Sequence, residues 1–450
     1  LEKRSIVPLL VKYSLPAIVG MVATSMYNII DAIFIGQWCG AFAIAGMALV
    51  FPIMNLLIAV GAMVGLGCAA TASISLGQNK HDRAMKVLGH CLVLSVVTGI
   101  LIGWAPYPWI RDLVEFFGAT ENTVEPAYDF LLVIMLGAPV SNTFMNLNHL
   151  MRASGYPRKA MVSLLISMVV NIGSAPIFIY VLDWGMTGAA LATIVAQGVS
   201  AVWVLAHFMQ KRSILHFRSG IYALQAPLVK RICTVGLPPC MLNVVGCVVV
   251  VVFNQLFLAY DGDIGVGAFG IVNRVMFVFV MIVLGITQGM QPIAGYNLGL
   301  GRYDRVRRVL FCAMAAGACI TTLGALAVEF FPREIVSLFA KEEDANSAQL
   351  IDIAVLGIRI MGLSFWVVGA QIVIGNFFQS IGRPAMSVFL NLTRQVIFLL
   401  PALWLLPKWI GEPGIWGAQV VGDTLSIFTS FIVLYFFVKR NLNQKNISLS

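Results

Sequence analysis

The stretch LGQNKHDRAMKVL at residues 76–88 returns as LGLGRYDRVRRVL at residues 298–310, at an offset of 222 residues. Their Leu-Gly, Asp-Arg and Val-Leu pairs fall at matching positions, and each stretch is a charged connection between two long apolar runs. The same offset separates two Leu-Pro pairs, Leu15-Pro16 and Leu237-Pro238. These matches predict that the chain is an internal repeat of two homologous halves.

Glycine motifs in the later part of each half support this repeat. Gly155-Tyr156-Pro157 matches Gly382-Arg383-Pro384, and Gly185-x-x-Gly188-Ala189 matches Gly414-x-x-Gly417-Ala418. The motifs keep their order in both halves. We therefore expect the homology to extend over the full length of each half.

The composition places these halves in a membrane. Of the 450 residues, 59% are hydrophobic and only 11% are charged, whereas an average soluble domain has about 25% charged residues. A soluble fold of this size covers its surface with charge, which this chain cannot do. The composition therefore excludes a cytosolic enzyme, a nucleic-acid-binding protein and a disordered protein, and it indicates a polytopic helical membrane protein.

Twelve apolar stretches are long enough to span a bilayer, because a transmembrane helix needs about 20 residues. They are also far longer than the roughly 10-residue strands of a membrane β-barrel. We predict transmembrane helices over residues 11–36, 48–76, 87–107, 128–150, 160–182, 186–209, 232–259, 268–297, 308–331, 350–380, 385–406 and 414–438.

The predicted fold is all-α, with twelve transmembrane helices in two pseudo-symmetric six-helix lobes. Six is an even number, so both lobes insert with the same orientation, as parallel repeats do. We predict an N-terminal lobe over residues 1–210, a cytoplasmic linker over 211–231, a C-terminal lobe over 232–438 and a cytoplasmic tail over 439–450. Two lobes with a cleft between them suit alternating access better than a static pore.

The basic residues alternate between the connections. Most of the 29 lie at the N-terminus, in the even-numbered loops or at the C-terminus, and only Arg111, Arg333, Lys341 and Lys408 lie in the odd-numbered loops. The positive-inside rule then places both termini in the cytoplasm. Because the basic residues are spread over the predicted cytoplasmic segments, the net charge of +9 does not indicate binding to nucleic acid.

No small-residue cleavage site follows the first residues, so we expect no cleavable signal peptide.

Ionisable side chains inside the spans are the candidate functional residues, because each costs roughly 2.5–3.5 kcal/mol at the bilayer centre on insertion scales. Asp31 and Asp423 are the carboxylates well inside apolar spans, and Arg274, Arg359 and Arg394 are the basic residues there. All three arginines belong to the second half of the chain.

Asp423 and Arg394 each lie about nine residues into consecutive spans, which gives both a depth of roughly 14 Å. Arg359 has a similar depth in the tenth span. One interpretation of Asp423 is a buried ion pair with Arg394 or Arg359, and the other is a direct role in transport. Gln255 and Gln291 complete a possible polar network in the C-terminal lobe.

Asp31 differs, because its lobe has no lysine or arginine at that depth. It is either a neutral carboxyl held by hydrogen bonds or at the outer interface, or a group that takes up a proton or a metal cation. Tyr27 and Asn28 lie three to four residues earlier, on the same side of the helix. Asn171 and Thr193 have matching depths in the fifth and sixth spans. Carboxylate, amide and hydroxyl oxygens suit Na⁺ or H⁺ better than a soft metal, so we expect no other metal and no cofactor.

Catalytic motifs are absent from the sequence. The five histidines form no His-x-x-x-His pair, and no Walker or dinucleotide fingerprint occurs. The chain is therefore not expected to be an enzyme or to draw energy from ATP.

Several motifs resemble the multidrug and toxic compound extrusion (MATE) family of secondary transporters, over nearly the whole chain and in the family's order. They are Tyr27-Asn28-Ile29-Ile30-Asp31, Arg152 to Pro157, Asn171 to Pro176, Gly289-Met290-Gln291-Pro292, and Arg394 with Pro401. The resemblance is greater to the bacterial DNA-damage-inducible-type (DinF-like) branch than to the branch with acidic residues in spans seven and ten.

The resemblance implies export of organic cations against entry of Na⁺ or H⁺. It also implies a cation site at Asp31, Asn171 and Thr193, with Tyr27 adjacent. One position departs from the family, whose members usually carry a second aspartate where this chain has Ala175. The loss of that charge favours proton coupling through Asp31.

We therefore expect a multidrug antiporter that exports small cationic or amphipathic compounds in exchange for H⁺ or Na⁺. It would be a monomer in the bacterial cytoplasmic membrane, with lipids and drugs as its partners. The alternative is a flippase for a lipid-linked precursor, with Arg274, Arg359 and Arg394 supplying a basic cavity. A channel is a third class, which the proline-broken helices and the lone carboxylate disfavour.

Overall fold

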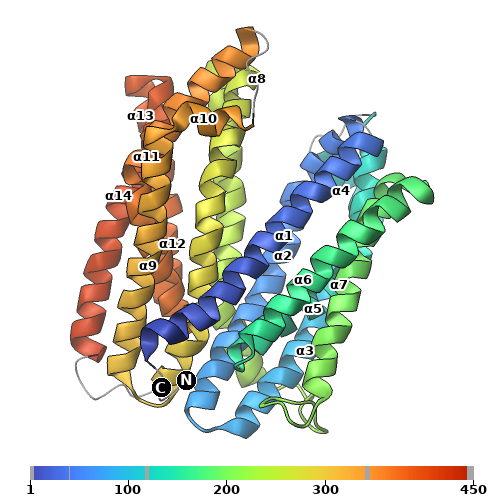
Figure 1. Cartoon of the computed structure of the whole chain (residues 1–450), viewed down its shortest axis with the longest axis vertical. Coiled ribbons are helices and arrows are strands. Elements are labelled where there is room, and N and C mark those ends of the chain that lie inside the picture. Colours follow the sequence, from blue (N-terminus) through green and yellow to red (C-terminus); the bar gives the residue numbers. More distant parts are fainter. Residues whose placement is uncertain (1–4, 40, 117–120, 340–344, 443–450) are drawn as a thin grey trace. The chain divides into compact units, whose positions relative to one another are not determined.

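The computed structural model describes residues 5–39, 41–116, 121–339 and 345–442, and every regular element in these ranges is helical (Figure 1). Twelve helices among the described residues are long and apolar enough to cross a membrane. The predicted fold of twelve transmembrane helices is thus confirmed. Four of the loop and terminal basic residues used to predict the orientation, Lys3, Arg4, Lys341 and Lys445, lie outside the described residues, as does most of the predicted tail.

The first half contains α1 (Ile6–Trp38), α2 (Ala41–Gly77), α3 (His81–Trp104), α4 (Ile110–Phe116), α5 (Val124–Ala153), α6 (Pro157–Pro176) and α7 (Gly185–Met209). The second contains α8 (Ala226–Gly299), α9 (Tyr303–Phe330), α10 (Pro332–Ser337), α11 (Ala345–Ser380), α12 (Pro384–Leu392), α13 (Leu400–Ile410) and α14 (Glu412–Phe437). A 3₁₀ turn, η1 (Tyr107–Trp109), precedes α4, and π-helical segments η2 (Ile177–Val181), η3 (Thr393–Leu399) and η4 (Val438–Leu442) follow α6, α12 and α14.

Helix α8 comprises two membrane spans, Ala226–Gly262 and Ile264–Gly299. They join at Gly262, whose φ of 62° and ψ of −150° are not helical. A positive φ is readily adopted only by glycine, which has no Cβ to clash with the backbone. Gly262 therefore lets the chain turn directly from the seventh span into the eighth.

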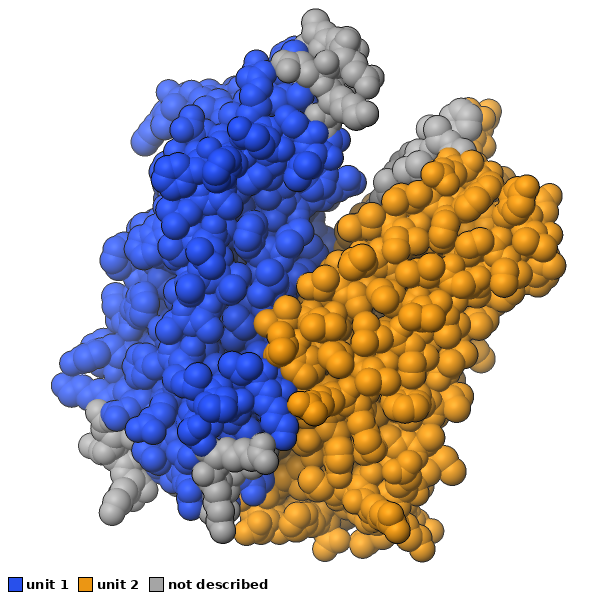
Figure 2. All heavy atoms as spheres, viewed as in Figure 1, with its two compact units in different colours: residues 1–14, 244–450 blue, residues 15–243 orange. Residues whose placement is uncertain are grey.

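The chain forms two compact units, which Figure 2 shows in different colours. Unit 1 comprises Leu1–Ser14 and Val244–Ser450, and unit 2 comprises Leu15–Asn243. Two helices, α1 and α8, thus begin in one unit and continue in the other. The predicted lobes are continuous stretches of the chain. The two units instead group the helices by their contacts, so residues 1–14 belong to the unit that contains the second half.

Each exchanged helix end is anchored in the unit that receives it. The Ser14 hydroxyl of α1 donates a hydrogen bond to the Ile286 carbonyl oxygen of α8, at 3.4 Å, within unit 1. The start of α8 packs against α2 within unit 2, where Gly236 touches the Met63 backbone and Gly67 touches the Ile232 backbone. Only glycine permits backbones to approach so closely, as is typical of contacts between membrane helices.

In unit 2, helix α5 packs against α2, α3 and α7, and α7 packs against α6. One apolar cluster joins Ile35 of α1, Phe130 of α5, Ala175 of α6 and Ala189 of α7. The polar residues of these helices are therefore held at fixed levels along the bundle.

In unit 1, α11 packs against α9 and α14. The core around Trp416 of α14 is aromatic: its ring centroid lies 4.4 Å from that of Phe257, and Phe253 stacks on Phe269 at 4.8 Å. Helices α9 and α11 meet through Gly317 and Gly369, and the Gly369 N–H donates to Thr321 Oγ1 at 3.3 Å.

A methyl group at Gly369 is expected to force α9 and α11 apart. The added Cβ would lie 2.6 Å from Thr321 Oγ1 and closer still to the Gly317 carbonyl oxygen. We expect Gly369→Ala to lower the unfolding free energy by about 1–3 kcal/mol, the usual cost of overpacking. Thermal unfolding of the purified protein in detergent measures this loss.

The matched control is Gly270→Ala, in α8 of the same unit, where a Cβ meets nothing within 4 Å. Because alanine favours helix over glycine, this variant should melt at or slightly above the wild-type temperature. Equal melting temperatures for the two variants would contradict the close contact between α9 and α11.

Candidate functional site

Asp31 lies in the part of α1 that belongs to unit 2, and only 4% of its surface is exposed. Its Oδ1 atom is buried and has no hydrogen-bond partner. Among the salt bridges of the described residues, none involves Asp31. The carboxylate thus lies inside a helical bundle without an ion-pair partner in the part of the chain that the structure describes.

Asn171 and Thr193 meet across α6 and α7. The Asn171 amide Nδ2 donates to Thr193 Oγ1 at 3.3 Å, and both side chains are buried. The other amide atom, Asn171 Oδ1, is buried without a donor. Because native proteins pair nearly all buried polar atoms with protein or water, this unmatched acceptor, like that of Asp31, is suited to a proton donor, a water molecule or a cation.

Tyr27 fixes the level of Asp31 relative to α7. The Tyr27 side chain interacts with Gln197 of α7, and it is close enough to Asp31 for the two groups to interact electrostatically. One helical turn separates Tyr27 from Asp31, and one turn separates Gln197 from Thr193. Since α1 runs opposite to α7, both steps lead in the same direction along the bundle. Asp31 therefore lies at the level of Thr193.

Two residues near this site were not predicted from the sequence. The Ser141 hydroxyl of α5 donates a hydrogen bond to Gln197 Oε1. The spacing of Gln197, four residues after Thr193, could have indicated it. The predicted residue Asn28 lies in α1, but its side chain is outside the described part of the structure.

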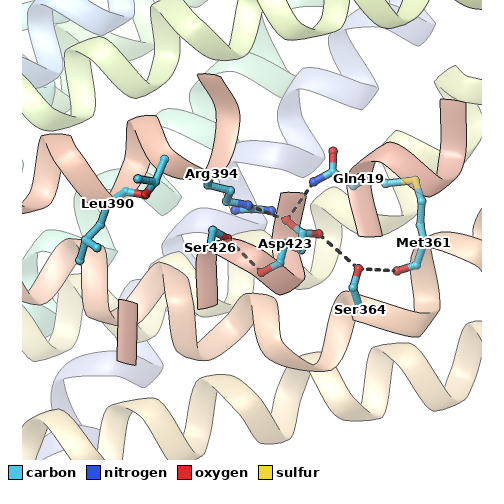
Figure 3. Close-up of polar contacts among 8 residues, drawn as sticks. Met361, Ser364, Leu390, Arg394, Gln419, Asp423 and Ser426 are labelled. Carbon is cyan, nitrogen blue, oxygen red and sulfur yellow. Dashed lines mark hydrogen bonds and ion pairs between the residues drawn. The ribbon is translucent and has the colours of Figure 1, made fainter. Parts of the chain in front are cut away.

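The second carboxylate, Asp423 of α14, has a different environment (Figure 3). Arg394 Nε donates to Asp423 Oδ1 at 2.8 Å, and Gln419 Nε2 donates to the same oxygen at 3.0 Å. The Ser364 hydroxyl of α11 donates to Oδ2 at 3.4 Å. Asp423 is buried, and its partner Arg394 is 20% exposed. Its negative charge is therefore neutralised within unit 1.

Arg394, and not Arg359, is the arginine that the structure brings to Asp423. Arg359 of α11 instead pairs with Glu329 of α9 at 3.2 Å, and both side chains are well exposed. Of the two predicted glutamines on α8, Gln255 is exposed and Gln291 is buried. The amide that binds Asp423 is that of Gln419, one helical turn before it on α14.

Arg394 is carried by the π-helical segment η3, and Pro401 follows two residues after the end of η3. Proline has no N–H to donate, and its ring clashes with the carbonyl four residues earlier, so the helix before it cannot keep regular hydrogen bonds. Wide π turns occur at such points and often at functional sites. In the first half, the π-helical segment η2 begins directly after Pro176 instead of ending before a proline.

The repeat shows that the Asp31 site exists in one half only. By the offsets of the proline and glycine motifs, the equivalents of Asp31, Asn171 and Thr193 are Phe253, Phe398 and Gly422. Conversely, Arg394 takes the place of Ser167, and Asp423 that of Ile194. The first half has a lone carboxylate where the second has an aromatic ring, and the second has an ion pair where the first has none.

Comparison with known proteins decides the family. The family model MatE matches residues 16–177 and, a second time, residues 239–404. The chain belongs to the MatE family. The double match also agrees with the two homologous halves predicted from the repeat, and the predicted family is confirmed.

Relatives of this MatE protein include the multidrug export protein MepA of Staphylococcus aureus (strain MSSA476). The two are 22% identical over 439 residues, which cover 98% of this chain and 96% of the relative.

Similar solved structures include a MOP superfamily transporter from Pyrococcus furiosus, with a TM-score of 0.91 and 23% identity, covering 97% of this chain and 96% of that one. An outward-facing MATE family transporter gives a TM-score of 0.90 at 22% identity, covering 98% and 100%. These structures establish the fold of this MatE protein as that of multi-pass membrane transporters.

The two carboxylates of this MatE protein should respond oppositely to neutralisation. Asp423→Asn leaves the Arg394 guanidinium without its counter-charge, which is expected to cost about 3 kcal/mol. Asp31→Asn removes a buried charge that has no basic partner, so it should leave stability unchanged or raise it. Melting temperatures of both variants in one detergent at neutral pH provide the comparison.

The double variant Arg394→Leu/Asp423→Leu serves as the control, because removing both charges leaves neither unpaired. It should recover most of the stability that Asp423→Asn loses. A wild-type melting temperature for Asp423→Asn, together with a large drop for Asp31→Asn, would contradict these environments.

Proposed function

We propose that the protein is a secondary active multidrug efflux transporter that exports cationic or amphipathic organic compounds in exchange for H⁺ or Na⁺. The family and the name of the Staphylococcus relative support efflux of drugs. The observation that carries the exchange is Asp31, a carboxylate inside the first half with no basic partner among the described residues. We further propose that it acts as a monomer in the cytoplasmic membrane, with both termini in the cytoplasm.

The energetic cost of this carboxylate gives it a coupling role. A charged side chain in the bilayer interior is unfavourable, and neutralisation by a proton or by a cation removes that cost. A proton and a cationic compound can both satisfy the same negative charge, but not at the same time. Asp31 would therefore release one when it binds the other.

Helix α1 provides a connection from Asp31 to the other unit. Its first turns belong to unit 1, where Ser14 is hydrogen-bonded to Ile286, and it continues into unit 2 from Leu15. Pro16 follows at once and weakens the helix there, because it removes one backbone hydrogen bond. When Asp31 is loaded, a shift or bend of α1 near Pro16 would alter the access of the two units to the substrate.

The proton is the coupling ion that we favour. Ala175 is buried one turn after Asn171, at the position where the resemblance to the family implies a second aspartate. Asp31, Asn171 and Thr193 then offer one carboxylate, one amide oxygen and one hydroxyl. A single proton needs only the carboxylate, whereas Na⁺ would need all three side chains and water molecules as ligands.

The flippase alternative has less support. It requires basic side chains that are free to bind phosphate, but Arg359 pairs with Glu329 and Arg394 pairs with Asp423. Two of the three arginines that it would use already have carboxylate partners.

Transport by purified protein in liposomes tests the proposal. We expect an inward H⁺ gradient to drive efflux of a cationic dye, and an inward Na⁺ gradient alone to drive little. Asp31→Asn should reduce H⁺-driven efflux at least about tenfold, because an amide cannot exchange a proton in this range. Dye fluorescence under each gradient, imposed separately, is the measurement.

The matched control is Asp112→Asn, which neutralises an exposed carboxylate on α4 and should transport like the wild type. Wild-type efflux by Asp31→Asn would refute the coupling role of Asp31. Efflux driven equally well by Na⁺ alone would refute the preference for the proton.

A further inference from the structure

Polar side chains recur along the facing sides of α6 and α7, far beyond the level of Asp31. On α6 they are four residues apart, and on α7 they are three to seven apart, so on each helix they share one side. The members are Lys159, Ser163, Ser167 and Asn171 on α6, and Thr193, Gln197, Ser200 and His207 on α7. Six of these eight are buried in the bundle, and Lys159 and Gln197 are half-buried. We call this row of side chains the polar seam.

Hydrogen bonds cross the seam at several levels. Besides the Asn171–Thr193 bond, the Ser200 hydroxyl donates to the Ser163 carbonyl oxygen at 2.9 Å, and Lys159 Nζ donates to His207 Nδ1 at 3.2 Å. These pairs show that α6 and α7 run in opposite directions with a constant register. From Thr193 to His207 the seam is 14 residues long, or about 21 Å.

Helix α5 closes the third side of the seam. Its Ser141 hydroxyl binds Gln197, and its Asn148 Nδ2 donates to Ser163 Oγ at 2.7 Å. One turn further along α5, Arg152 Nη2 donates to Asn148 Oδ1 at 2.9 Å. A chain of polar contacts therefore leads from the level of Gln197 to Arg152 at the end of α5.

Unmatched polar atoms lie at both ends of the seam. Asp31 Oδ1 and Asn171 Oδ1 are buried without a partner at one end, and His207 Nε2 is buried without a partner at the other. Such atoms in native proteins are usually satisfied by internal water. A file of water between α5, α6 and α7 would connect the carboxylate to the far end of the unit.

Fixed positive charge stands at that far end. Arg152 is only 5% exposed, and no salt bridge among the described residues involves it. Its charge is therefore not cancelled by a carboxylate. The Lys159 ammonium lies 3.2 Å from His207 Nδ1, within reach to donate a hydrogen bond to the ring. Titratable groups near this end include His149, beside Arg152, and Tyr156, whose ring meets that of His207 edge-on at 4.5 Å. His216 Nδ1 lies 3.3 Å from the Ser213 carbonyl oxygen.

The segment after α7 covers the same end. The Ser213 hydroxyl donates to the His207 carbonyl oxygen at 2.9 Å, and the Ile214 N–H donates to the Tyr156 hydroxyl at 3.3 Å. Beyond them, the Phe217 N–H donates to the Phe208 carbonyl oxygen at 2.8 Å. The segment after α7 thus contacts the end of the seam at His207 and Tyr156.

We propose that Arg152 and Lys159 form an electrostatic plug that closes a hydrated seam to protons and metal cations. This inference rests on the proposed function, because it concerns the ion held at Asp31. A fixed cation in a narrow polar path repels a proton that arrives on the adjacent water, as positive groups do in water channels. A proton bound at Asp31 then cannot pass along the seam to bulk water. It leaves the carboxylate only by the route that opens during transport, which keeps ion entry coupled to export.

Passive proton flux in the absence of any drug tests the plug. The full chain is reconstituted in liposomes that contain a pH-sensitive dye, an inward proton gradient is imposed, and valinomycin with K⁺ holds the membrane potential at zero. Wild-type protein should admit few protons. Arg152→Gln and Lys159→Gln should each raise the flux at least about tenfold, because each removes one unit of the positive charge that repels a proton on adjacent water. Arg158→Gln, which neutralises the exposed neighbour of Lys159, should behave like the wild type.

A second variant shows whether the leak passes Asp31. Adding Asp31→Asn to Lys159→Gln should return the flux to the wild-type level, and a leak that persists would overturn the connection between the seam and the carboxylate. Wild-type flux in both single variants, when they elute as monodisperse protein, would overturn the plug. If Arg152→Gln does not fold, Lys159→Gln alone decides, because its side chain is only half-buried.

The same liposomes separate this inference from the proposed function. Proton-driven dye efflux by the wild type, without a leak in the variants, would refute the plug and leave the antiporter standing. A leak in the variants, without proton-driven dye efflux by the wild type, would support the plug and refute the antiporter.

Discussion

The structure depends on how a membrane bundle accommodates a carboxylate, which costs roughly 2.5–3.5 kcal/mol at the bilayer centre on insertion scales. The two halves do so in opposite ways. Asp423 is bound by Arg394, Gln419 and Ser364, so its charge is a fixed part of the packing of unit 1. Asp31 has no such partner among the described residues, and its charge is left to be neutralised by something mobile. We propose that this difference makes one of two homologous bundles an ion site.

Divergence of the repeat explains why the difference arose without a change of fold. Both halves keep the matched Leu-Pro pairs and the glycine motifs at residues 155–157 and 185–189 and at residues 382–384 and 414–418, and the family model matches both halves. The side chains at the equivalent positions have changed, with Phe253 in place of Asp31 and Arg394 in place of Ser167. The same helical frame thus holds an aromatic core and an ion pair in unit 1, and a polar seam that leads away from a lone carboxylate in unit 2. Because α1 and α8 each extend through both units, a change at Asp31 has a continuous helix along which to act.

The sequence predicted what depends on length and order along the chain. The twelve spans follow from apolar run lengths and the repeat from motif spacing, whereas the family was predicted from the resemblance of several motifs, and all three are confirmed. Depth counting also placed Asp423 beside an arginine. It could not choose between Arg394 and Arg359, because depth along a helix says nothing of the direction in which a side chain points. For the same reason Ser141 and Gln197 were missed, and the exchange of the ends of α1 and α8 was not foreseen, since it depends on contacts between distant segments. Whether Asp31, Asn171 and Thr193 bind the coupling ion stays a prediction.

The central claim is that Asp31 gives up a proton when a drug binds, and counting that proton tests it most directly. Purified protein in weakly buffered detergent solution is titrated with a cationic dye while the pH is recorded. The account predicts release of about one proton for each dye bound by the wild type, because one carboxylate changes its protonation state, and release of almost none by Asp31→Asn. Equal proton release by the two proteins would contradict it.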